Sequence, residues 1–309
     1  GTEGMAAMGV LAMDRARRLV DAADAATALS VEALLGSARP FRREIHELRP
    51  HPGQVASARR VAALLEGSPI VASHTDDFDH AVQDAYSLRC APQVHGAVTD
   101  TLDHMEAVLT RELGSVVDNP IVFPETGEVL SAGNFHGQPL AFVLDFAAIA
   151  TAELGSISER RTDRLLDPVR SQGLPAFLAE DAGVNSGFMI SQYVQAALVA
   201  ENRVLAHPAS VDSVPTSGMQ EDHVSMGWGA ARKLLTVLDN VRRVLAVEIL
   251  CACQGIEYRR PLEPAPGTGR ILSLVREKVP PLTGDRELSA DIEAVADLIA
   301  DGSISALLR

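Results

Sequence analysis

The chain has 309 residues, of which 47% are hydrophobic and only 4% aromatic, and its 27 basic and 41 acidic side chains give a net charge of −14. This acidic balance argues against nucleic acid and anionic membrane surfaces as partners. No continuous apolar run reaches the roughly 20 residues of a membrane-spanning helix, and the N-terminal residues do not resemble a signal peptide. The three cysteines, Cys90, Cys251 and Cys253, are too few for a disulfide framework, so we expect a cytoplasmic protein.

The predominance of Ala, Leu and Val over aromatic residues favours packed helices over a sheet. In chain order, residues 10–35 are alanine-rich and helix-prone, and residues 40–52 are expected to form a basic loop. A short helix is predicted over 55–65, with Arg59 and Arg60 pointing outward.

Pro92 should divide residues 79–114 into two helices, because its ring removes a backbone donor and restricts the preceding residue. The stretch from 118 to 141 has the strand and turn character of a small hairpin. Long helices are predicted over 139–164, 189–205 and 229–255, and shorter ones over 268–278 and 285–300. These patterns predict an all-α protein, an elongated bundle of long antiparallel helices in a single domain that spans residues 1–309.

A first candidate site is the run Gln83, Tyr86 and Arg89, spaced three residues apart on the helix expected before Pro92. An arginine there could hold a substrate carboxylate with two hydrogen bonds, and the tyrosine could act as acid, base or donor. A capped helix end with a solvated arginine explains the same spacing.

Two further stretches carry polar groups beside glycines. In Gly133–Gly137 the glycines flank Phe135 and would permit close approach of a ligand, although a tight turn before a helix has the same pattern. Gln220 and Glu221 open the string QEDH ahead of the 229–255 helix, where acidic residues also complement a helix dipole. No metal-ligand spacing, phosphate loop or nucleotide fingerprint is present, so we expect neither a metal nor a nucleotide cofactor.

Together these stretches resemble the aromatic amino-acid ammonia-lyase family, and within it the lyases that act on histidine. Five blocks match in the family's order: QDAYSLRCAPQVHG, DNPIVF, SAGNFHGQPLA, NSGFMISQYVQAALVAEN and PTSGMQEDHVSMG. The resemblance implies an ammonia-lyase/fumarase-like helical fold and elimination of ammonia from L-histidine to give trans-urocanate. It also implies a methylidene-imidazolone electrophile and a homotetramer whose sites combine residues of several subunits.

The family makes that electrophile from an Ala-Ser-Gly triplet, and no such triplet occurs in these 309 residues. The resemblance therefore implies the C-terminal portion of a longer lyase. We expect the isolated chain to be inactive, and a separate polypeptide that carries the N-terminal segment is one expected partner.

The resemblance also implies roles for six residues. Tyr86 would assist the elimination, Arg89 would pair with the substrate carboxylate, and Gln83 would help to position it. Phe135 would lie against the electrophile and the substrate ring. Glu221, with Gln220 behind it, would face the imidazole.

Two alternatives stay open at this point. One is a lyase or aminomutase acting on another aromatic amino acid, which ring recognition near Glu221 would distinguish. The other is a catalytically silent helical oligomerisation fragment, which the absent triplet favours and the intact site motifs oppose.

Overall fold

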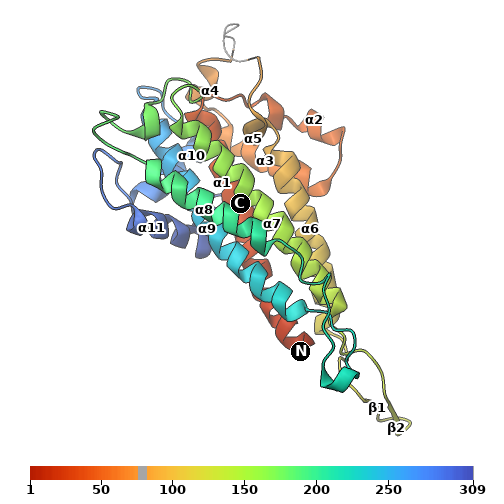
Figure 1. Ribbon diagram of the computed structural model, residues 1–309. Helices are drawn as coiled ribbons and strands as arrows, with labels where there is room; N and C mark the ends of the chain where they lie inside the picture. Colours follow the sequence, from red (N-terminus) through yellow and green to blue (C-terminus); the bar gives the residue numbers. More distant parts are fainter. Residues whose placement is uncertain (76–81, 309) are drawn as a thin grey trace.

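The computed structural model describes residues 1–75 and 82–308 and shows an elongated helical bundle (Figure 1). A two-stranded antiparallel hairpin projects at one end, and the short helices before α6 lie at the other. The elements are α1 (Thr2–Ala33), η1 (Arg39–Phe41), α2 (Arg43–Glu47), α3 (Pro52–Leu65), α4 (Pro69–Ala72), α5 (Tyr86–Arg89), α6 (Ala91–Leu113), β1 (Ile121–Phe123), β2 (Glu128–Leu130), α7 (Gln138–Leu166), η2 (Ala176–Leu178), α8 (Met189–Leu205), η3 (Ser217–Met219), α9 (Gly227–Glu257), α10 (Pro266–Arg276), α11 (Ser289–Ala300) and α12 (Ser303–Ala306). The predicted all-α class is confirmed.

The long helices α1, α7 and α9 run in the same direction. Their first turns meet at Met5, whose sulfur would lie 2.8 Å from a Cβ at Gly137 and 2.7 Å from one at Gly227. Their last turns meet again at Gly255, where a Cβ would lie 2.9 Å from that of Ala33. Helices α6 and α8 run antiparallel to these three (Figure 1). Helix α6 leads the chain to the start of α7, and α8 returns it from the end of α7 to the start of α9.

Several boundaries follow the sequence pattern. Helix α8 has the predicted bounds, and α9 extends the predicted 229–255 by two residues at each end. Pro92 stands in the first turn of α6, where its missing N–H is tolerated, so it separates α5 from α6 as expected. The predicted hairpin is present, with Val122 opposite Val129.

Three local predictions were wrong. Helix α1 begins at Thr2, because its first turns pack on the starts of α7 and α9. The expected loop at 40–52 contains η1 and α2, which are held by the hydrogen bond between His46 Nε2 and the carbonyl of Pro40 at 2.9 Å. Arg60 does not point outward: its Nε donates to the buried carboxylate of Asp24 at 2.7 Å, an attraction that the sequence pattern of α3 alone does not reveal.

Helix α9 is the centre of the bundle and contacts α1, α7, α8 and α11. Its segment 244–253 is completely buried by these neighbours within the same chain. Helix α7 is long and apolar enough, by length and composition, to cross a membrane, with a mean hydropathy of 1.7. However, 61% of that apolar stretch is buried inside the bundle, as in any core helix, so the segment is weak evidence for a membrane span.

Glu32 gives a testable pH dependence. Burial raises the pKa of its carboxyl, although hydrogen bonds from Ser68, Thr268 and the backbone of Ala265 act in the opposite direction. Because the folded-state pKa lies above the unfolded value, the folded state binds the proton more tightly. Glu32 therefore stabilises the fold most at low pH, and its contribution is lost as the pH rises from about 4.5 through the folded pKa. A tenfold difference in proton affinity between the folded and unfolded states corresponds to about 1.4 kcal/mol.

The measurement is the free energy of unfolding of wild type and Glu32→Gln from pH 4 to 8. The wild type should lose stability relative to the variant as the pH rises. Glu66→Gln is the matched control, because it removes an exposed carboxylate next to α3. A wild-type advantage that stays constant across this range would contradict the prediction.

Candidate active site

Tyr86, which is exposed, and Arg89, which is half-buried, form a small unit at one end of the bundle. They are the first and last residues of α5, which ends at Cys90 just before α6. The guanidinium carbon of Arg89 lies 4.5 Å from the centre of the Tyr86 ring, and the tyrosine is 70% exposed. Nε of Arg89 donates to the carbonyl of Asp84 at 2.8 Å. Its terminal nitrogens make no hydrogen bond within residues 1–75 and 82–308.

Gln83 does not share the helix of Tyr86 and Arg89. The predicted helix started at residue 79, but 79–81 lie outside the described residues and 82–85 are not helical. Ala85 is extended, and the carboxylate of Asp84 accepts the backbone N–H of Ser37 at 2.8 Å. This contact with the segment after α1 fixes a bend, and Gln83 lies exposed on it.

Phe135 and Glu221 lie at the opposite end, on two loops that touch. Phe135 is 48% exposed in the turn between β2 and α7, and the next residue, His136, hydrogen-bonds the carbonyl of His223 at 3.2 Å. The two imidazole rings stack with their centres 5.7 Å apart. These contacts join the Phe135 turn to the loop that carries Gln220 and Glu221, both of which are exposed.

The structure shows the local geometry of the two stretches at this end. The N–H of His136 donates to the carbonyl of Gly133, so the glycine-flanked segment is a tight turn that leads into α7. The neighbour that a side chain at Gly137 would meet first is Met5. Glu221 does not cap α9: the helix begins at Gly227 with no acidic residue in its first turn.

Glu221 is fixed by its own loop. Its backbone pairs with Thr216 in an isolated antiparallel bridge, and the Thr216 hydroxyl donates to its carboxylate at 2.5 Å. Within the part of the chain that the structure describes, the second carboxylate oxygen of Glu221 accepts no hydrogen bond. The loop therefore fixes Glu221 while one carboxylate oxygen stays without a hydrogen bond among the described residues.

The structure does not bring the two groups together within one chain. Helix α6 lies between them and has 23 residues, a length of about 35 Å. Helix α5 precedes α6 and the β1–β2 hairpin follows it (Figure 1). Tyr86 and Arg89 lie on α5, and Phe135 follows β2. No amino acid can touch both ends, so a site that uses all six predicted residues needs more than one chain.

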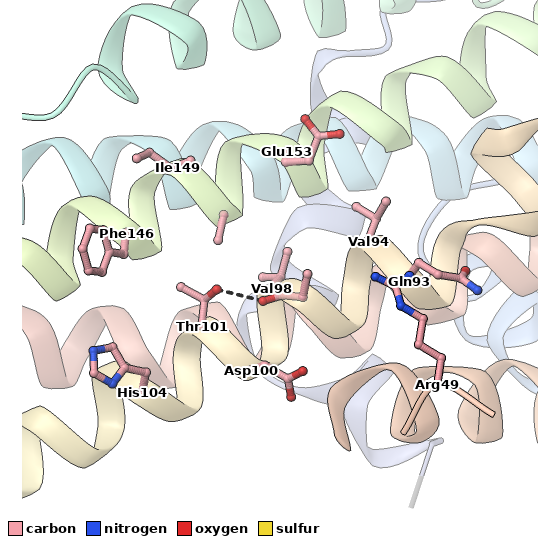
Figure 2. Close-up of a pocket in the computed structure, with 12 residues that line it drawn as sticks. Arg49, Gln93, Val94, Val98, Asp100, Thr101, His104, Phe146, Ile149 and Glu153 are labelled. Atoms are coloured by element: carbon pink, nitrogen blue, oxygen red, sulfur yellow. Dashed lines mark hydrogen bonds between the residues drawn. The ribbon is translucent and has the colours of Figure 1, made fainter. Parts of the chain in front are cut away.

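A cavity of about 780 Å³ between α6 and α7 contains none of the six predicted residues. Figure 2 shows its apolar walls, with Phe146 and Ile149 of α7 facing Val94 and Val98 of α6. The polar side chains Arg49, Gln93, Asp100, Thr101, His104 and Glu153 lie around them. The helical spacing of Phe146 and Ile149 is the sequence signal for this face, and neither residue belongs to the motifs that predict the site. Among the described residues, no three His, Cys, Asp or Glu side chains come together as a metal site.

Comparison with known proteins identifies the class to which this fold and these loops belong. Residues 1–277 match the aromatic amino acid lyase family, and the chain belongs to that family. It is 53% identical over 304 residues to histidine ammonia-lyase of Gloeobacter violaceus, a match that covers 98% of this chain and 59% of the relative.

Solved structures show the same fold. Histidine ammonia-lyase from Trypanosoma cruzi superposes with a TM-score of 0.91 at 46% identity, covering 100% of this chain and 57% of that one. Tyrosine aminomutase from Streptomyces globisporus superposes with a TM-score of 0.92 at 41% identity, covering 100% and 62%. The chain thus spans about three-fifths of the length of the curated relatives that it matches.

Proposed function

We propose that this chain supplies part of a shared active site that eliminates ammonia from L-histidine to give trans-urocanate in the cytoplasm. The observation that carries the proposal is the 53% identity to a histidine ammonia-lyase over 98% of the chain. The open, fixed carboxylate of Glu221 supports histidine as the substrate, because it can accept a hydrogen bond from an imidazole N–H.

An aminomutase that acts on tyrosine is the second candidate. Its support is the superposition on the aminomutase from Streptomyces globisporus, whose TM-score is as high as that of the histidine lyase. The shared fold therefore does not distinguish a histidine lyase from a tyrosine aminomutase. The distinction depends on how Glu221 interacts with the substrate ring. A benzene ring has no hydrogen-bond donor for the second carboxylate oxygen, and a phenol donates only from a neutral hydroxyl. A protonated imidazole donates a charged N–H, which favours the histidine lyase.

In the proposed reaction the substrate loses a proton from Cβ and ammonia from Cα, and a double bond forms between these carbons. Arg89 would bind the substrate carboxylate through its open terminal nitrogens, and Tyr86 beside it would assist the elimination. Phe135 would lie against the substrate ring, with Gln220 behind Glu221. Gln83, on the bend before α5, would help to hold the carboxylate.

The β-hydrogen is weakly acidic, so an electrophile must withdraw charge as it leaves; a methylidene-imidazolone ring supplies this chemistry in the family. Phe135, which would lie against such a ring, is 48% exposed. None of the 309 residues belongs to an Ala-Ser-Gly triplet, so the ring would come from another segment.

The separation of the two groups along α6 leads us to propose a homo-oligomer, with a tetramer as the expected state. The apolar segment 244–253 gives no support for an oligomer, since it is already buried within one chain and needs no partner. The outer face of α7 provides a better reason: Phe142, Phe146 and Ile149 are each more than 40% exposed and form an apolar stripe.

Light scattering should therefore give a mass several times the 32.8 kDa of one chain at micromolar concentration. Phe146→Glu should lower that mass, because a charge would be buried in the contact. Val169→Glu is the control, since it places the same charge on an exposed loop. A mass of one chain for the wild type would contradict the oligomer.

The function is tested by mixing the 309-residue chain with a polypeptide that supplies the remaining length of the Gloeobacter violaceus relative. Urocanate absorbance and released ammonia are measured after histidine is added. We expect no product from the chain alone and product from the mixture. Product from the chain alone would overturn the inactivity of the isolated chain, and a stable complex without turnover would favour the silent oligomerisation fragment.

A further inference from the structure

A buried ion pair joins the centre of the bundle to the short helix that carries Tyr86 and Arg89. Arg161 of α7 donates through Nε and Nη2 to the carboxylate of Glu248 in α9, at 2.5 and 2.9 Å. The hydroxyls of Ser30 and Ser158 donate to the same two oxygens at 2.7 and 2.6 Å. Both charged side chains are 0% exposed, so the pair is fully removed from water and its carboxylate is fully hydrogen-bonded.

One donor of Arg161 is directed away from this pair. Its Nη1 donates to the backbone carbonyl of Ser87 at 3.2 Å. Ser87 lies in α5 between the two candidate site residues Tyr86 and Arg89. The guanidinium is therefore a bridge from the carboxylate in α9 to the backbone of α5.

Helix α5 depends on such contacts for its orientation. It has only four residues, and a helix of this length is not stable by itself. Leu88 anchors one side in the core, and Asp84 ties the preceding bend to Ser37. The hydrogen bond from Arg161 to the carbonyl of Ser87 adds a polar contact to the backbone of α5 itself, which these two contacts do not provide.

The small net stability expected of a buried ion pair also suggests a role other than stabilising the fold. A buried ion pair is often matched or exceeded in stability by apolar residues of similar size, so stability alone does not account for it. Arg161 is too deeply buried to touch a substrate, so it is not a catalytic residue. We propose that Arg161 and Glu248 are positioning residues, which orient α5 and thereby the ring of Tyr86 and the two-donor edge of Arg89. The catalytic consequence rests on the proposed function; the orientation of α5 does not.

The test is the ¹⁹F NMR spectrum of the chain labelled with 3-fluorotyrosine, which reports only Tyr86, Tyr193 and Tyr258. Tyr86→Phe assigns the first signal. The paired replacement of Arg161→Met with Glu248→Met removes both charges and should leave a cooperatively folded chain. Its Tyr86 signal should shift or broaden, because the stacking of Arg89 on the ring is lost, while the other two signals stay unchanged.

Ser30→Ala is the matched control. It removes a hydrogen bond to the same carboxylate but leaves the bond from Arg161 to the Ser87 carbonyl, so it should weaken the fold without moving the Tyr86 signal. If the double variant does not fold, Arg161→Lys replaces it, since lysine retains the charge opposite Glu248 but cannot span both acceptors. An unchanged Tyr86 signal in the folded variant would overturn the positioning role.

Activity in the complemented mixture separates this inference from the proposed function. The double variant should lose kcat/KM for histidine by about tenfold or more, and Ser30→Ala by about twofold or less. A moved Tyr86 signal together with a wild-type mixture that makes no urocanate would leave α5 positioning intact and overturn the function. An active wild-type mixture, together with a Tyr86 signal that does not move in the double variant, would support the function and overturn the positioning of α5.

Discussion

Replacing Arg89 with lysine is expected to lower kcat/KM for histidine by about 30- to 900-fold in the complemented enzyme, a loss of about 2–4 kcal/mol. Nε of Arg89 is already used by the carbonyl of Asp84, and the guanidinium plane rests on Tyr86. The terminal nitrogens are left as a planar two-donor edge that matches a carboxylate. A lysine ammonium cannot hold the Asp84 carbonyl and offer such an edge at the same time.

Steady-state kinetics with Arg111→Lys as the control would check this result, because Arg111 is an exposed arginine at the far end of α6. The control should keep wild-type kcat/KM, and the melting temperature of both variants should stay close to that of the wild type. Wild-type kcat/KM for Arg89→Lys would remove Arg89 from the carboxylate-binding role.

Glu221→Gln is expected to lower kcat/KM for histidine by at least about tenfold, or about 1.4 kcal/mol, and to raise the relative rate with phenylalanine. The carboxylate accepts from an imidazole N–H and favours its charged form, whereas burying it unpaired beside a phenyl ring is unfavourable. The same group thus attracts histidine and rejects phenylalanine. Its bond to the Thr216 hydroxyl fixes the orientation of the carboxylate.

Thr216→Val separates recognition from loop stability. It removes the hydroxyl that orients Glu221 but keeps the charge, so activity should fall while the preference for histidine over phenylalanine is largely kept. The measurement is kcat/KM for histidine and for phenylalanine in Glu221→Gln and in Thr216→Val. An unaltered substrate ratio in Glu221→Gln, combined with a lower melting temperature, would assign Glu221 to loop stability and remove the best support for histidine.

The residues of the candidate site could be named from the sequence because they occur in ordered motifs. The structure places Tyr86 and Arg89 on α5, just before Pro92, and Phe135 in the turn before α7. Their surroundings were not visible: the stacking of Arg89 on Tyr86 and the bond from Thr216 to Glu221 are contacts that spacing does not specify. The catalytic roles themselves stay predictions.

The sequence by itself determined the elements whose causes are local. Proline in a first helical turn, turn residues in the hairpin and the 3.6-residue apolar period of α8 act over a few neighbours, so their effects can be read along the chain. Only the tertiary structure decided features that depend on residues far apart. Arg161 and Glu248 are 87 positions apart, Arg60 and Asp24 are 36 apart, and Gln83 lies on a bend fixed by Ser37. The length of α6 likewise separates the two halves of the site, because the direction of each helix is set by packing between whole elements and not by the residues within any one of them.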